Sequence, residues 1–102
     1  MQQQDYIERM IAQIAAAVAR ILGLAKATPE EAERELASTW SGVIGLRRAD
    51  IDRLDASTVR ALLGPKRVAA AMLLDAEADV RRSQGQIDDA ERLAALAAKL
   101  RA

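Results

Sequence analysis

Residues 7–21 of the 102-residue chain have the sequence IERMIAQIAAAVARI, in which large apolar side chains recur at alternating intervals of four and three. This spacing places them along one side of a helix and predicts an amphipathic helix over about 3–24. The seam consists of Ile7, Ile11, Ile14, Val18 and Ile21, widened by Met10, Ala17 and Leu22. We expect it to face the core, and its width also favours contact with a second copy of the chain.

Helix start and stop signals divide the residues that follow. Gly23 predicts the end of the first helix, because glycine favours the left-handed conformation that closes a helix. The tetrad Thr28-Pro29-Glu30-Glu31 predicts the start of a second helix, with the Thr28 hydroxyl capping the exposed amides and Glu31 completing a capping box. The second helix is expected to end near Trp40 or Ile44, where Gly42 and Gly45 loosen it.

The remaining residues predict a connector and two more long helices. A short helix over about 56–63 is expected to be capped by one of the aspartates before it and ended by Gly64-Pro65. Helices are then predicted over about 66–83 and 87–100, separated by Gly85. The first of them is expected to carry one apolar face, which consists of Val68, Met72, Ala76 and Val80.

No segment has the alternating, β-branched pattern of a strand, so the predicted fold class is all-α. The length fits a single domain over 1–102, which we expect to be a bundle of about five helices. The predicted parts are a first hairpin over 3–45, a connector with a short helix over 46–65, and a second hairpin over 66–101.

Composition restricts the chemistry that the chain can perform. Hydrophobic residues make up 51% of the sequence, the net charge is zero, and Tyr6 and Trp40 are the only aromatic residues. The balance is that of a globular domain without the basic field that nucleic-acid binding requires. The sequence contains no cysteine and no histidine, which removes cysteine nucleophiles and the commonest metal ligand and general base. We therefore expect no enzyme activity, no cofactor and no metal.

The apolar run at the beginning of the chain does not predict a membrane span. Met10 to Ala19 is bounded by Arg9 and Arg20, whereas a spanning helix needs about 20 apolar residues. Asp5 and Glu8 precede the run, which is unlike the basic leader of a secretory signal. The sequence thus favours a cytoplasmic protein that does not enter a membrane.

Residues 71–102 resemble one tetratricopeptide repeat, a helical hairpin whose two helices cross at small residues. Gly85 matches the turn glycine, Ala90 the small crossing residue and Ala97 the later alanine. The aromatic positions of the motif are occupied by Leu74, Arg81 and Ala94. A weaker match covers Ile11 to Thr39.

Over its whole length the chain is also similar to a small bacterial family of tetratricopeptide-like proteins with no assigned activity. The matching residues are Gln4-Asp5-Tyr6, Arg9-Met10-Ile11 and Ile21-Leu22-Gly23-Leu24. Both resemblances imply helical hairpins, and neither implies a function.

Three further groups of residues have a structural and a functional interpretation. Trp40 belongs either to the core or to the rim of an exposed groove. The central basic residues form either a patch for acidic partners or a solvated connector, and they are Arg47, Arg48, Arg53, Arg60, Lys66 and Arg67. The carboxylates of Asp75, Glu77 and Asp79 form either a ligand site or a hydrated helix face, with Glu77–Arg81 and Asp88–Arg92 as surface ion pairs.

These patterns favour a non-enzymatic protein–protein interaction module or a self-associating helical scaffold. The partner is expected to be another protein or a second copy, and not nucleic acid or membrane. The candidate interaction residues are Ile7, Met10, Ile11, Ile14, Val18, Ile21 and Trp40. The alternative is a helical protein that binds a small ligand or a metal through surface carboxylates and arginines.

Overall fold

The computed structural model describes residues 2–102, with side chains from Gln4 onward, and Met1 lies outside the described residues. Within this part of the chain the structure is mostly helical and contains no strand, which confirms the all-α prediction. Its elements are α1 (Gln2–Ala27), α2 (Pro29–Thr39), the π-helix η1 (Trp40–Ile44), the single-turn α3 (Arg48–Ile51), α4 (Ala56–Leu63), the 3₁₀-helix η2 (Gly64–Lys66), α5 (Arg67–Ser83) and α6 (Ile87–Arg101).

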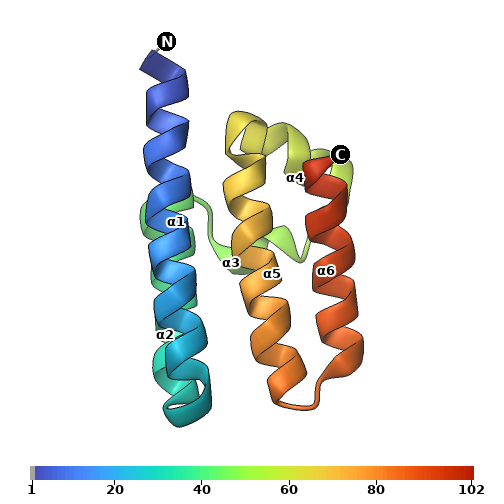
Figure 1. Ribbon diagram of the computed structural model, residues 1–102. Coiled ribbons are helices and arrows are strands. Elements are labelled where there is room, and N and C mark those ends of the chain that lie inside the picture. The colour runs from blue at the N-terminus through green and yellow to red at the C-terminus, as the bar shows by residue number, and fades with distance from the viewer. Residues whose placement is uncertain (1) are drawn as a thin grey trace.

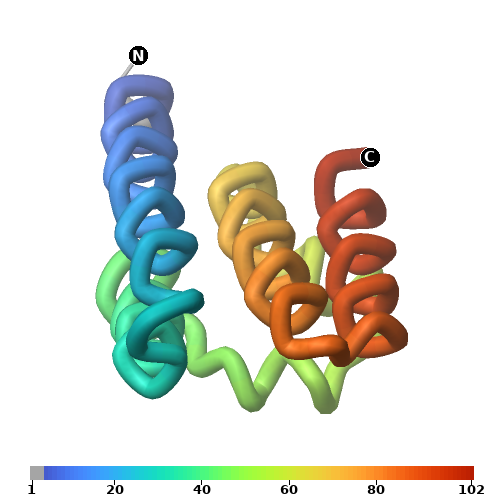
Figure 2. Tube along the Cα trace, turned by 60° about the horizontal axis from the view of Figure 1, so that its bottom comes forward, coloured from blue at the N-terminus to red at the C-terminus, as the bar shows by residue number. Residues whose placement is uncertain are grey.

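Two antiparallel helical hairpins make up the bundle, as Figure 1 shows. Helices α1 and α2 form the first hairpin and α5 and α6 the second, and α1 packs beside α5. The connector that contains α3 and α4 crosses between the hairpins on the side away from the viewer in Figure 1, and the turned view of Figure 2 shows its course. The molecule measures 40 × 26 × 19 Å, and α1 accounts for the longest dimension.

Helix α1 is longer than the sequence predicts. The helix continues through Gly23 to Ala27, and Gly23 has no positive φ. Leu24 and Ala25 still pack against the core beyond the glycine, so burial of this last turn keeps the chain helical. Gly23 as a helix stop was therefore a wrong prediction.

The second helix begins at the predicted residues but by a different mechanism. Thr28 occupies the N-cap position and Pro29 the first helical position, yet no side chain caps the helix. The Thr28 hydroxyl instead donates to the Leu24 carbonyl at 3.4 Å, within the last turn of α1. The predicted capping box with Glu31 is thus absent. In contrast, the predicted cap of α4 is present, because Asp55 accepts the Thr58 amide at 2.7 Å, which lowers the pKa of Asp55.

Helix α5 lies at the centre of the fold, between α1 and α6. Of the apolar face predicted for this helix, Ala76 and Val80 are buried, whereas Met72 is partly buried and Val68 is exposed. Because α1 and α6 cover α5 on two sides, the buried residues of α5 do not lie along a single face. The buried side chains of α5 are Ala69, Ala70, Ala71, Leu73, Leu74, Ala76, Glu77, Ala78 and Val80.

The turn between α5 and α6 is a Schellman motif around Gly85. The Gln86 amide donates to the Arg81 carbonyl at 2.9 Å, and the Gly85 amide donates to the Arg82 carbonyl at 3.1 Å. Gly85 itself has a φ of 79°, which favours glycine over any residue with a Cβ atom. The predicted stop at Gly85 is confirmed, and it sets the antiparallel return of α6.

We expect Gly85→Ala to lower the free energy of unfolding by about 1 to 2 kcal/mol, because alanine pays for the left-handed conformation. Gly23→Ala is the matched control, since an added Cβ meets nothing within 4 Å at either glycine. Gly23 is helical, so this control is expected to raise the free energy of unfolding by about 0.5 to 1 kcal/mol. Urea denaturation followed by circular dichroism measures the free energy of unfolding of both variants. A change of the same sign in both would contradict the left-handed conformation of Gly85 and the helical conformation of Gly23.

Candidate functional site

One side of α1 is uncovered by the rest of the bundle. Its core side is formed by Met10, Ile14, Ala17 and Ile21, all of which are buried. The exposed residues between Arg9 and Lys26 are Ala12, Gln13, Ala15, Ala16, Ala19, Arg20, Leu22 and Gly23. This side of the helix is therefore mostly apolar and built from small side chains.

The polar residues of this stretch lie along one border of the exposed side. Arg20 forms an ion pair with Glu35 of α2 at 2.8 Å, which holds it toward α2. At the opposite border, Ile11 and Val18 are partly buried against the core. Between these borders the exposed surface of α1 carries no charge from Met10 to Ala25.

The candidate interaction residues divide between core and border. Met10, Ile14 and Ile21 are buried, so they cannot touch a partner unless the bundle opens. The remaining seam residues are partly buried and border the exposed side, and they are Ile7, Ile11 and Val18. The structure thus places the predicted seam mainly inside, and the exposed side of α1 lies next to it.

Trp40 is a core residue, and its interpretation as the rim of an exposed groove was wrong. Its exposed fraction is 0%, and its indole Nε1 has no hydrogen-bond partner among the described residues. Trp40 begins the π-helix η1, in which the Gly45 amide donates to the Trp40 carbonyl at 2.8 Å. The wider turn places Thr39, Trp40 and Ile44 together in the core.

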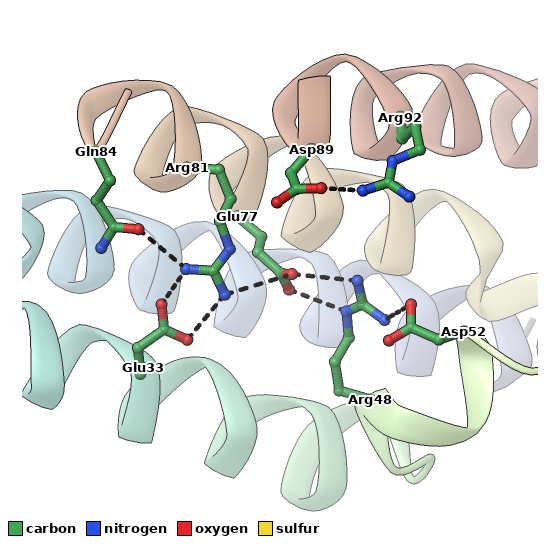
Figure 3. A network of polar contacts seen from close by, with 8 residues as sticks. All are labelled: Glu33, Arg48, Asp52, Glu77, Arg81, Gln84, Asp89 and Arg92. Atoms are coloured by element: carbon green, nitrogen blue, oxygen red, sulfur yellow. Dashed lines mark hydrogen bonds and ion pairs between the residues drawn. The ribbon is translucent and has the colours of Figure 1, made fainter. Parts of the chain in front are cut away.

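A buried glutamate joins the connector to α5. Glu77 is 6% exposed, and Arg48 of α3 donates to both of its carboxylate oxygens, at 3.0 and 3.1 Å (Figure 3). Arg48 also pairs with Asp52 at 2.7 Å. Burial alone lowers the pKa of Arg48, but the hydrogen bonds to Glu77 and Asp52 outweigh it, and the pKa is raised. The guanidinium therefore stays charged.

Arg81 extends this network to the first hairpin. It pairs with Glu33 of α2 through both guanidinium nitrogens, lies 3.9 Å from Glu77 and contacts Gln84 (Figure 3). The hydrogen bond from Arg81 to Glu33 is the main reason that the pKa of Arg81 is raised, despite partial burial. The network thus ties α2, α3 and α5 together on the side of the bundle away from the exposed side of α1.

A cleft of about 430 Å³ lies beside this network. Its lining residues are Arg48, Asp52, Glu77, Arg81, Asp89, Arg92, Leu93 and Leu96. Three arginines face three carboxylates there, and each carboxylate is already paired with an arginine. Among the residues whose side chains the structure describes, no group of three or more acidic residues is arranged to hold a metal ion.

The carboxylates of α5 do not form one hydrated face. Glu77 is buried, whereas Asp75 pairs with Arg101 at 2.6 Å and Asp79 pairs with Arg82 at 2.9 Å on the surface. The predicted ion pair between Asp88 and Arg92 was also wrong, since Arg92 pairs with Asp89, one residue later.

The central basic residues form no continuous patch. Arg48 is bound to Glu77, Arg47 pairs with Asp50 at 3.2 Å, and the Lys66 ammonium donates to the Ile44 carbonyl at 3.1 Å. Arg60 donates to the carbonyl of Ala102 at the end of α6. These contacts attach the connector to both hairpins. Arg47 and Arg53 are exposed, as expected for a solvated connector, whereas Arg48 is largely covered by its contact with Glu77.

The residues on which the resemblance to a tetratricopeptide repeat rests lie in the second hairpin. Gly85 forms the turn, and Ala90 and Ala97 are fully buried on α6. Comparisons with protein-family models, with curated proteins and with solved structures find no match for the chain. The resemblance therefore stays a prediction from these residues.

We expect Glu77→Gln to lower the free energy of unfolding by about 1.5 to 3 kcal/mol, because hydrogen bonds to charged groups in a buried network contribute that much. Asp79→Asn is the control, since its exposed pair with Arg82 contributes at most about 1 kcal/mol. Urea denaturation of both variants measures the difference. Equal losses would mean that the network does not stabilise the fold.

Proposed function

We propose that this chain is a non-catalytic protein–protein interaction module that binds a partner helix along the exposed side of α1. The observation that carries the proposal is that, from Met10 to Ala25, the only charged residue on that side is Arg20, which lies at its border and pairs with Glu35 of α2. A two-turn or longer apolar surface on an exposed helix is typical of sites that receive an amphipathic helix.

The side chains on this surface favour a helix as the partner. Ala12, Ala15, Ala16 and Ala19 project little from the backbone, so another helix can approach α1 closely. Leu22 is 37% exposed and adds apolar area next to the alanines. The surface is narrow and straight, as is the apolar stripe of a helix.

The chemistry of the remaining surface supports a binding role over catalysis. The sequence lacks histidine and cysteine, and the carboxylates of the cleft are neutralised by arginines. No group there is free to act as a general base without breaking an ion pair.

The cleft supports a second candidate, a small-ligand site that uses arginines and carboxylates. Its volume of about 430 Å³ fits a small organic molecule, and Leu93 and Leu96 add an apolar wall. An anionic ligand would have to displace Asp89 from Arg92 or Asp52 from Arg48. We therefore rank this candidate below the interaction module.

Helix α1 has a further property that bears on its partner. Within the described residues it is the one helix long and apolar enough to cross a membrane by length and composition, a condition that core helices of soluble proteins also meet. We propose a protein partner because α1 packs against α2 and α5 and buries Met10, Ile14 and Ile21 in the core.

The double variant Ala15→Glu/Ala19→Glu tests the proposal. Both residues are exposed, so we expect the fold to be kept while partner binding falls at least tenfold through the burial of two new charges. Crosslinking in living cells followed by quantitative mass spectrometry measures binding. The matched control is Ala95→Glu/Ala98→Glu on α6, where both residues are also exposed. Unchanged crosslinking of the α1 variant would contradict the proposal.

A further inference from the structure

The exposed side of α1 contains a second seam with the periodicity of a coiled coil. Its members recur at intervals of four and three, and they are Glu8, Ala12, Ala15, Ala19, Leu22 and Lys26. Five of them directly follow the residues of the inner seam, which are Ile7, Ile11, Ile14, Val18 and Ile21. All six are exposed in the structure. One seam of α1 thus faces mainly inward, and an equivalent one, rotated by about 100° around the helix, faces outward.

We propose that this outer seam binds the same seam of a second copy of the chain, so that the two α1 helices pack antiparallel. This inference rests on the proposed function and names the partner. The register is set by a two-fold axis at the level of Ala17. A residue that lies a given number of positions before Ala17 in one copy is then opposite the residue that lies the same number of positions after Ala17 in the other copy. Ala15 then lies opposite Ala19 of the second copy, and Ala12 opposite Leu22 of the second copy.

Charge decides between the antiparallel and the parallel arrangement. Glu8 and Lys26 stand nine residues on either side of Ala17, so the antiparallel register places each Glu8 opposite Lys26 of the second copy. A parallel pair would place Glu8 against Glu8 and Lys26 against Lys26, which is repulsive. The outer seam is acidic at one end and basic at the other, and this complementarity favours the antiparallel dimer.

Glu8 and Lys26 form no ion pair within the described part of the single chain. Among the described residues, neither Glu8 nor Lys26 takes part in an ion pair, and the side chain of Glu8 accepts only a hydrogen bond from Gln4 at 3.4 Å. Other charged residues of the first hairpin do form ion pairs, such as Arg20 with Glu35. Both ends of the outer seam are therefore available to a second copy.

The flanks of the seam also suit a close approach of two helices. Ile11 and Val18 are partly exposed on one flank and provide apolar contact area. Ala16 and Gly23 lie on the other flank, and no heavy atom lies within 4 Å of where a Cβ of Gly23 would be. Large side chains on one flank and small ones on the other allow the alanines at the centre to touch.

The contact is smaller than that of a permanent dimer. One helix face over about 27 Å, the rise from Glu8 to Lys26, covers less than the roughly 800 Å² per partner of a standard interface. We therefore expect a reversible dimer with a dissociation constant in the micromolar range. A two-fold contact is closed, so assembly stops at two copies.

Sedimentation velocity over micromolar to millimolar concentration tests the dimer. We expect a monomer–dimer equilibrium that Glu8→Lys or Lys26→Glu weakens by about tenfold, because each single change replaces two attractive pairs by two repulsive ones. The double variant Glu8→Lys/Lys26→Glu is expected to regain the affinity of the original chain. A monomer at every concentration, or a double variant as weak as the single ones, would overturn the inference.

The direction of pairing is tested with engineered cysteines, since the chain has none of its own. An Ala12→Cys protein is mixed with a Leu22→Cys protein under mild oxidation. The antiparallel register predicts disulfides between the two different proteins, whereas disulfides between identical proteins would indicate parallel helices and overturn the register.

Two outcomes separate this inference from the proposed function. If the chain is monomeric while Ala15→Glu/Ala19→Glu still abolishes crosslinking to a different protein, the second copy is the wrong partner and the interaction module stands. If the chain is monomeric and that variant changes no crosslink, both fail. Binding of the monomeric chain to phosphatidylcholine vesicles, lost in Ala15→Glu/Ala19→Glu, would assign the outer seam to a lipid surface and also overturn the dimer.

Discussion

The close packing of α5 between α1 and α6 is the constraint on which the rest of the structure depends. Alanines at 69, 70, 71, 76 and 78 let both neighbours approach, and Leu73, Leu74 and Val80 fill the space between them. Helix α1 lies at the edge of the bundle, where α2 and α5 pack against it. The side of α1 that faces away from these two helices stays exposed.

The sequence predicts features that depend on neighbouring residues. The spacing of the seam, the turn at Gly85 and the cap at Asp55 follow from local patterns, and the structure has all three. Features that depend on distant partners could not be predicted in this way. Glu77 looks like part of a hydrated face, but its partner Arg48 lies 29 residues earlier and burial follows from that contact. Gly23 looks like a stop, but packing of the residues after it keeps the helix intact.

The polar network and the apolar exposed side of α1 lie on different sides of this bundle. The network of Arg48, Glu77, Arg81 and Glu33 neutralises itself while it joins the connector, the first hairpin and the second hairpin. Bidentate arginine–carboxylate pairs have defined geometry, so they fix the relative positions of the helices that they join. The exposed side of α1 lies away from this network and, apart from Arg20 at its border, carries no charge from Met10 to Ala25.

The burial of Trp40 also gives the molecule an internal optical probe. It is the single tryptophan of the chain, its indole is fully shielded, and its Nε1 has no hydrogen-bond partner among the described residues. An indole held out of water emits at shorter wavelength than one in contact with solvent. The colour of the intrinsic fluorescence therefore reports whether the first hairpin is closed, without any label and from one known position.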